Sequence, residues 1–236
     1  MPKGNGWPTA TPSAGNLISP FYLLTLSPFH LFNFPMFPYK IILASGSPRR
    51  RELLSGLGLE YEVRLLPNID ESYPEGLTGE EIAQCISRKK ADAYKANIAT
   101  DELIITADTI VYLDGQVLGK PVDEDDARRM LLALSGRTHQ VITGVTLLTA
   151  EREETFDTVS EVRFANLTNE EIDYYVSHYK PLDKAGAYGI QEWIGFVGVE
   201  SIEGSYFNVM GLPVQRLYQA LKTFLSPNSQ LAINNS

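Results

Sequence analysis

Two of the residue types that most often build metal centres and covalent cross-links are nearly missing from this sequence. Its 236 residues include one cysteine. Because Cys85 is the single cysteine, the chain can form neither an internal disulfide nor a cysteine-rich zinc site. Cys85 lies in a predicted helix with no histidine near it in sequence, so we interpret it as a packed thiol. There are only three histidines, and no two of them are spaced as metal ligands. These shortages argue against metal or triad chemistry led by histidine.

Basic charge is also scarce. The chain has 20 Lys and Arg against 29 Asp and Glu, a formal net charge of -9. This balance argues against a general binder of nucleic acid or membrane surfaces. It leaves room for one concentrated basic pocket that holds a small phosphorylated ligand. The hydrophobic content of 44% is that of an ordinary soluble protein, and the length allows one large domain or two small ones.

Residues 1 to about 35 are almost free of charge. The run from 17 to 37 is apolar enough to suggest a signal peptide, but no clear cleavage site follows it. Prolines at positions 20, 28 and 35 interrupt it too often for a membrane-spanning helix. We therefore interpret 1–38 as a non-core leader, with the hypothesis that Met36 is the true start. Residues 39–225 are expected to form one domain and 226–236 a frayed tail.

The most informative stretch covers residues 41–54, with the sequence IILASGSPRRRELL. An apolar run of strand character ends at Ala44, and Ser47 can cap a helix whose first residue is Pro48. Arginines then stand beside backbone N–H groups that lack helical partners. This combination suits phosphate oxygens. Taken alone, the stretch fits a solvated basic helix start equally well.

Further along, the patterns predict alternating strands and helices. Capping boxes begin helices at Thr78 and Thr168, and Asp114-Gly115 is a favourable hairpin turn. Strands are expected at 61–66, 103–112, 139–149 and 155–167, further helices at 123–135 and 213–224, and a last hairpin from strands 196–202 and 205–210. The order predicts an α/β fold with a mixed central sheet.

Two charged residues stand where their neighbours predict burial. Asp108 interrupts the apolar run 103–112, where an unpaired carboxylate is costly. It is either a strand-end or bulge residue bonded to the backbone or a functional group, and its strongly apolar flanks favour the second interpretation. Lys90 shares a helix face with Ala83 and Ile86. Such a lysine usually reaches solvent, and otherwise it points into a cleft.

Loops supply the remaining candidates, including a segment at 183–191 whose glycines let the backbone approach a ligand. The candidate set is Arg49, Arg50, Glu71, Lys90, Asp108, Lys120 and Gln191. The basic groups could clamp a polyphosphate. The two carboxylates could hold Mg²⁺ or Mn²⁺, or one of them could activate a water. The constellation suits hydrolysis of a phosphoanhydride.

Five segments resemble, in the same order, the motifs of the Maf family of nucleotide pyrophosphatases. They are SGSPRRRELL at 45–54, ADTIV at 107–111, GKP at 119–121, LSGR at 134–137 and DKAGAYGIQ at 183–191. The resemblance covers about residues 40–225. It implies a Maf/ITPase-like two-lobed fold with a long mixed central sheet and an active-site cleft between the lobes. It also implies a cytoplasmic homodimer that cleans the nucleotide pool by hydrolysing nucleoside triphosphates to the monophosphate and pyrophosphate, with a divalent metal cation and with no nucleic-acid or membrane partner.

The resemblance also implies roles for single residues. Asp108 takes the catalytic position, as the general base or as a metal ligand together with Glu71. The phosphate-binding positions are Ser45, Arg50, Lys90 and Lys120. The positions associated with base choice are Arg49, Thr109 and Gln191, and this combination resembles the branch that acts on dTTP and UTP. Glutamine and arginine can pair with the carbonyl and imide edge of a pyrimidine.

Two alternatives stay open. One is a non-enzymatic nucleotide-binding regulator of septum formation, which the presence of all the carboxylates and lysines disfavours. The other is an enzyme of the same family that acts on 7-methyl-GTP. Arg49 disfavours it, because that branch typically has a bulky aromatic residue at this position. Modified pyrimidine nucleotides are a further option that the sequence does not separate from dTTP and UTP.

Overall fold

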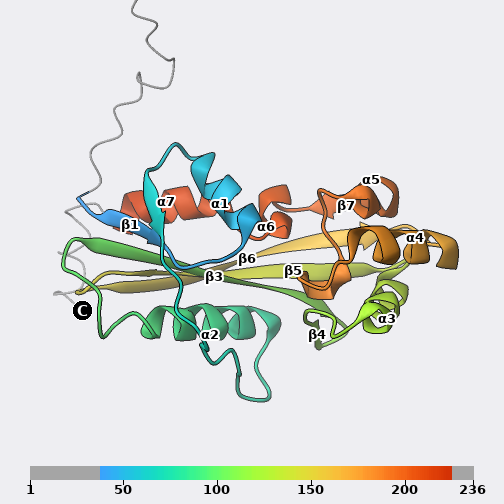
Figure 1. The fold of residues 1–236 in the computed structure, drawn as a ribbon, viewed down its shortest axis with the longest axis horizontal. Coiled ribbons are helices and arrows are strands. Elements are labelled where there is room, and N and C mark those ends of the chain that lie inside the picture. The colour runs from blue at the N-terminus through green and yellow to red at the C-terminus, as the bar shows by residue number, and fades with distance from the viewer. Residues whose placement is uncertain (1–37, 225–236) are drawn as a thin grey trace, which may run out of the picture. The chain divides into compact units, whose positions relative to one another are not determined.

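The computed structural model describes residues 38–224, which are built around a seven-stranded sheet (Figure 1). Apart from residue 38, the predicted leader and tail lie outside these residues. The strand order is β2-β1-β3-β5-β6-β7, and the short β4 pairs with β3. The strands are β1 Lys40–Leu43, β2 Tyr61–Val63, β3 Glu102–Leu113, β4 Gln116–Leu118, β5 Thr138–Leu148, β6 Glu153–Phe164 and β7 Val199–Glu203.

The sheet is mixed. β1 is parallel to both of its neighbours, β2 and β3. The pairs β3–β4, β3–β5, β5–β6 and β6–β7 are all antiparallel. The predicted α/β class with a long mixed central sheet is therefore confirmed.

Helices cover both faces of the sheet. In Figure 1, α1, α6 and α7 lie on one side of the long strands and α2 lies on the other. The helices are α1 Pro48–Ser55, α2 Gly79–Asp92, α3 Glu124–Leu134, α4 Asn169–Tyr179, α5 Trp193–Gly198, α6 Tyr206–Met210 and α7 Val214–Phe224, with a 3₁₀ turn η2 at Ala185–Ala187. Ser47 caps α1, and the capping boxes at Thr78 and Thr168 are both formed as predicted. No helix within 38–224 is long and apolar enough to cross a membrane.

Alternation along β3 sends its side chains to different partners. Leu103 and Ile105 are buried in the cluster that contains Leu54 of α1 and Leu221 of α7. Ile104 is buried on the opposite face with Ala91 of α2 and with Tyr94, which follows it. Successive strand residues point to opposite faces, so β3 contributes to both layers of the core.

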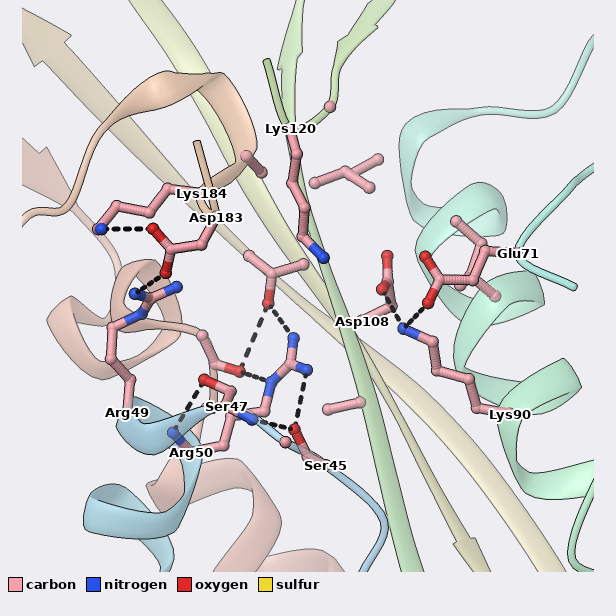
Figure 2. A pocket seen from close by; sticks show the side chains of 18 of the residues that line it. Ser45, Ser47, Arg49, Arg50, Glu71, Lys90, Asp108, Lys120, Asp183 and Lys184 are labelled. Atoms are coloured by element: carbon pink, nitrogen blue, oxygen red, sulfur yellow. Dashed lines mark hydrogen bonds and ion pairs between the residues drawn. The ribbon is translucent and has the colours of Figure 1, made fainter. Parts of the chain in front are cut away.

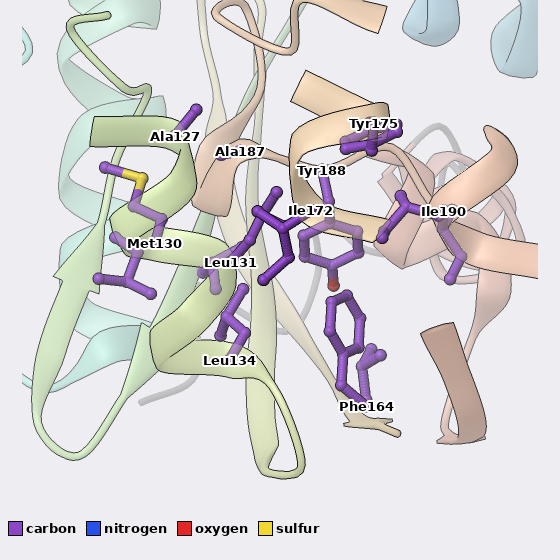
Figure 3. Packing of buried hydrophobic residues seen from close by; sticks show 14 of the residues in the cluster. Ala127, Met130, Leu131, Leu134, Phe164, Ile172, Tyr175, Ala187, Tyr188 and Ile190 are labelled. Carbon is purple, nitrogen blue, oxygen red and sulfur yellow. The ribbon is translucent and has the colours of Figure 1, made fainter. Parts of the chain in front are cut away.

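A further cluster lies at the other end of the long strands (Figure 3). There Leu131 and Leu134 of α3 pack with Ile172 and Tyr175 of α4 and with Phe164 at the end of β6. The long strands thus carry one lobe around α1, α2 and α7 and another around α3 and α4, as the two-lobed prediction expects.

The strand β3 has one edge segment without a strand partner among the described residues. On that edge, β1 pairs with β3 only as far as Ile105, and β4 pairs with it from Val111 onward. Residues 106–110 therefore face an opening, which we call the β3 notch. The loop after β1 and the loop after β4 both start at this notch, so their side chains are brought together there.

Two predictions about strands are wrong. The strand expected at 61–66 ends at Val63. The expected hairpin of 196–202 and 205–210 is instead helix α5, strand β7 and helix α6. Ser205 accepts a hydrogen bond from the Asn208 backbone and so caps α6, while the Asn208 side chain donates to the Val141 carbonyl at 3.0 Å. These contacts hold the segment as a helix against the sheet.

Candidate functional site

The β3 notch opens into a cavity of about 950 Å³, within the size range of pockets for small organic ligands. Every site residue predicted from the sequence lines it: Ser45, Arg49, Arg50, Glu71, Lys90, Asp108, Thr109, Lys120 and Gln191. They come from the loop after β1, the start of α1, the loop before α2, α2 itself, β3, the loop after β4 and the glycine-rich segment. Figure 2 shows those of these side chains that it labels gathered around β3, namely Ser45, Arg49, Arg50, Glu71, Lys90, Asp108 and Lys120.

Asp108 lies in the middle of β3 and is compensated by Lys90. The strand runs through it in regular register, with Asp108 opposite Gly144 of β5, so the bulge interpretation is wrong. The Lys90 Nζ atom lies 2.6 Å from Asp108 Oδ1 and 3.0 Å from Glu71 Oε1. The Lys90 and Asp108 side chains are each 14% exposed. Lys90 therefore points into the cavity, where one ammonium holds two carboxylates together.

Arg50 enters from the other face of the sheet. Its Nε donates to the Gly211 carbonyl at 2.8 Å, and its two terminal nitrogens donate to Ser45 Oγ at 3.4 Å and Thr109 Oγ1 at 3.0 Å. Burial lowers the pKa of Arg50, and the nearby Asp108 charge acts in the opposite direction. These bonds use three of the five guanidinium N–H donors. Among the described residues, two donors are left for an anion.

The Thr109 hydroxyl forms hydrogen bonds with other residues of the protein. It accepts from Arg50 and lies 2.9 Å from the Thr143 hydroxyl. Thr143 in turn donates to the Asn208 carbonyl at 3.3 Å. A threonine has a single hydroxyl proton, which Thr109 can donate to the Gly211 carbonyl at 3.4 Å or to Thr143. Thr109, which the resemblance associates with base choice, thus contacts and orients Arg50.

The loop before α1 is ordered by its own serines. The Ser47 backbone N–H donates to Ser45 Oγ at 3.3 Å, and Ser47 Oγ accepts from the Arg50 backbone N–H at 3.4 Å. Ser45 is buried. The start of α1, where backbone N–H groups carry partial positive charge, therefore faces the cavity in a fixed conformation.

Arg49 belongs to a chain of ionic contacts that sequence reasoning did not identify. Its guanidinium lies 3.3 Å from Asp183, whose other oxygen lies 2.6 Å from Lys184 Nζ. Lys184 also lies 3.1 Å from Glu192 and is 8% exposed. Burial alone would raise the pKa of Asp183, but Lys184 and Arg49 outweigh it and lower that pKa. Tyr175 donates to Glu192 and completes the chain.

The sequence carried only a weak sign of this chain. Asp183 and Lys184 open the glycine-rich segment, whose glycines predict a site of close backbone approach, and Tyr175 has the spacing of a core residue. An adjacent Asp-Lys pair among small residues is the one signal that could have pointed to a buried ion pair.

Two predicted site residues keep polar atoms unused. The Oε1 atom of Gln191 is buried and has no hydrogen-bond partner among the described residues. A buried acceptor without a donor costs about 1–3 kcal/mol. Lys120 is exposed and lines the cavity, and Figure 2 shows its side chain directed into it. No carboxylate within 38–224 forms an ion pair with it. Both groups are therefore available to a ligand.

Glu71 and Asp108 are suited to hold a divalent cation together with a substrate. Within 38–224 no group of three or more His, Cys, Asp or Glu residues is placed to hold a metal ion. The Lys90 ammonium contacts one oxygen of each carboxylate, which leaves the second oxygen of Asp108 and of Glu71 for a metal. Mg²⁺ is commonly held by one or two carboxylates, with waters and substrate phosphates completing its shell. The residues fit a metal that arrives with a polyphosphate.

Comparison with known proteins gives consistent matches. The family model described as Maf-like protein matches residues 40–224. A dTTP/UTP pyrophosphatase of Phocaeicola vulgatus is 67% identical over 184 residues, which are 78% of this chain and 95% of that protein. A dTTP/UTP pyrophosphatase of Bacteroides fragilis is 63% identical over 184 residues, which again are 78% of this chain and 95% of that protein. One of Porphyromonas gingivalis is 52% identical over 192 residues, 80% of this chain and 96% of that protein.

Proposed function

Because the chain belongs to the family of Maf-like proteins, we propose that it hydrolyses dTTP and UTP to the monophosphate and pyrophosphate. The observation that carries this proposal is the Asp108–Lys90 pair at the floor of a cavity lined by further cations. The relatives named as dTTP/UTP pyrophosphatases support the substrate class. Modified pyrimidine triphosphates with the same base edge belong to that class.

The reaction is a displacement at the α-phosphorus. The oxygen of a water forms a bond to this phosphorus, Asp108 accepts a proton from the water, and the bond to the bridging oxygen of the β-phosphate breaks. Lys90, Lys120 and the free donors of Arg50 stabilise the negative charge on the departing pyrophosphate. Mg²⁺ or Mn²⁺ held by Glu71 and Asp108 would add charge neutralisation at the phosphoryl oxygens.

The base is recognised by Gln191 and Arg49. The unpartnered Oε1 atom of Gln191 needs a donor, and the N3–H of thymine or uracil supplies one. Cytosine has an acceptor at the same ring position. Satisfying a buried polar atom gives strong discrimination, because a ligand without the matching group leaves that atom unpaired.

We extend the proposal to the setting of the enzyme. It acts in the cytoplasm as a homodimer that removes unwanted nucleotides, with no nucleic-acid or membrane partner. The net charge of -9 supports the absence of a nucleic-acid partner.

The test is pyrophosphate release from a panel of nucleoside triphosphates with Mg²⁺ or Mn²⁺. We expect release from dTTP and UTP, loss of release with a chelator, and a decrease of at least about a hundredfold in kcat for Asp108→Asn, since it removes the proton acceptor. Asp114→Asn is the matched control, because Asp114 lies in the β3–β4 turn and pairs with Arg137. Its turnover should equal that of the wild type.

The other outcomes separate the alternatives. Release only from 7-methyl-GTP would keep the reaction and overturn the base assignment. Nucleotide binding with no release from any triphosphate would favour the non-enzymatic regulator. Near-normal turnover of Asp108→Asn would refute the role of Asp108.

A further inference from the structure

Beyond the cavity wall, three residues form a buried polar cluster next to the glycine-rich segment. They are Lys184, Glu192 and Tyr175, and we call them the loop clamp. Lys184 Nζ lies 3.1 Å from Glu192 Oε1, and the Tyr175 hydroxyl donates to the other oxygen of Glu192. Among the described residues that line the cavity, neither Glu192 nor Tyr175 is present. Lys184 does line the cavity, so it is Glu192 and Tyr175 that act on a ligand only through other residues.

The clamp holds the backbone of the glycine-rich segment. The Gly189 N–H donates to the Tyr175 hydroxyl at 3.0 Å, so this one hydroxyl joins α4 to the segment and to Glu192. The fit is close, because a Cβ atom at Gly189 would lie 2.8 Å from the Glu192 side chain. Tyr175 is fully buried in the core between α3 and α4 (Figure 3). The segment is thereby anchored to a rigid part of the molecule.

One end of this chain of contacts is Arg49, and Gln191, the other residue proposed to recognise the base, directly precedes Glu192 in sequence. Gln191 lies directly between the clamped Gly189 and Glu192 in sequence, and its Oε1 atom is kept buried without a partner. At the other end, Lys184 holds Asp183, which in turn holds Arg49. Figure 2 shows Lys184, Asp183 and Arg49 in line on one side of the cavity. The clamp thus contacts both the segment that holds Arg49 and the segment that carries Gln191.

The charges in the clamp depend on each other unequally. Lys184 is 8% exposed and Glu192 20% exposed, so removing the Lys184 charge would leave the Glu192 carboxylate poorly compensated, whereas Lys184 would keep Asp183 at 2.6 Å. Burial raises the pKa of Tyr175, and the Glu192 carboxylate raises it further, so the hydroxyl stays protonated as a donor. Stability alone does not account for these buried charged groups, because apolar side chains of similar size would stabilise the fold as well.

We propose that Lys184, Glu192 and Tyr175 are positioning residues that set base selectivity by fixing Gln191 and Arg49 relative to each other. This inference rests on the proposed function and adds to it the origin of its selectivity. A clamp that only stabilised the fold would affect all substrates equally. A clamp that positions Gln191 affects substrates according to whether they offer a donor to its carbonyl.

The test compares UTP with CTP, which is equal in size but lacks the N3–H donor. Tyr175→Phe removes the hydroxyl and keeps the ring, and Glu192→Gln keeps the shape and removes the charge. We expect the ratio of kcat/KM for UTP to that for CTP to fall about tenfold in each variant, the equivalent of one hydrogen bond. The loss should appear in KM for UTP, with kcat within about twofold of wild type.

Tyr179→Phe is the matched control. Tyr179 lies one turn later on α4 and stacks on Tyr175 with ring centroids 5.0 Å apart, and its hydroxyl makes no hydrogen bond within 38–224. Its UTP-to-CTP ratio should stay at the wild-type value. An active wild type with an unchanged ratio in both clamp variants would overturn the clamp alone. A wild type that hydrolyses no triphosphate would overturn the proposed function and the inference with it.

Discussion

Asp108 and Thr109 are neighbours on β3, and their side chains leave the strand on opposite faces. Asp108 meets Lys90 from α2, whereas Thr109 meets Arg50 from α1. In a continuous sheet these two groups would act in separate layers. At the β3 notch both layers reach the same cavity. Two adjacent residues therefore supply the carboxylate that we propose to be catalytic and a support for the arginine that we propose to bind phosphate.

The hydrogen bonds of Thr109 lead to a prediction about its role. Thr109→Val has nearly the same shape but removes the acceptor for Arg50. We expect kcat/KM to fall by about ten- to a hundredfold, the range for a lost hydrogen bond to a charged group. Because Arg50 is assigned to phosphate, the decrease should be the same for UTP and CTP. Steady-state kinetics with both nucleotides measures it.

Thr109→Ser is the matched variant, since it keeps the hydroxyl and should retain kcat/KM within about twofold of wild type. If Thr109 contacted the base directly, Thr109→Val would change the ratio between UTP and CTP. That result would contradict the positioning role and restore the direct contact that the family resemblance implies.

At the scale of elements, α2 packs on β5 with almost no space between the two backbones. A Cβ atom at Gly144 would lie 2.2 Å from the Ala83 carbonyl oxygen. Gly144 is also the residue opposite Asp108 in the sheet, and Lys90 lies two helical turns after Ala83. The absence of a side chain at Gly144 thus lets α2 lie close enough for Lys90 to reach Asp108.

We therefore expect Gly144→Ala to lower both stability and turnover. Overpacking of this kind costs about 1–3 kcal/mol in the free energy of unfolding, and the displaced α2 carries Lys90 away from Asp108. Chemical denaturation and kcat for dTTP measure the two effects. Gly56→Ala is the control, because Gly56 ends α1 with helical backbone angles. A Gly144→Ala protein with wild-type stability and kcat would refute the close-packing argument.

Elements were predictable where their signals are local. The caps at Ser47, Thr78 and Thr168 depend on residues within one turn, and the structure forms all three. The segment 205–210 was misjudged because Asn208 folds it through contacts with Val141 and Ser160, which are distant in sequence.

The site divides in the same way. Its residue types were recognisable from motifs, and the structure gathers them in one cavity. The β3 notch depends on where β1 and β4 stop pairing with β3, and the loop clamp joins Tyr175 to Glu192 across two elements. Neither the notch nor the clamp could be predicted from the periodicity of the sequence, because each arises from tertiary contacts.

At the scale of the whole molecule, the fold and the site use the same set of strands. The three long strands carry a hydrophobic cluster at each end, and the cavity lies where β3 passes between them. All seven strands and every residue that lines the cavity fall within residues 40–224, the range that the family model also matches. The described strands and the residues that line the cavity thus lie in the same part of the chain that the family model matches.

This leads to a prediction about the chain before Met36. A protein that begins at Met36 keeps β1 and should melt within about 2 °C of the full chain, because even 1 kcal/mol would shift Tm by about 2–4 °C at this size. Its kcat/KM for dTTP should equal that of the full chain. Scanning calorimetry and pyrophosphate release measure the two properties.

The matched control begins at Ala44 and so lacks β1, which lies between β2 and β3 in the sheet. Ile41, Ile42 and Leu43 are buried there, and fully burying side chains of this kind contributes about 1.5–3 kcal/mol each. Because whole domains are stable by only about 5–15 kcal/mol, the shorter protein should not fold. A protein from Met36 that melted several degrees lower would instead show that residues 1–35 contribute to the fold, and the leader hypothesis would be wrong.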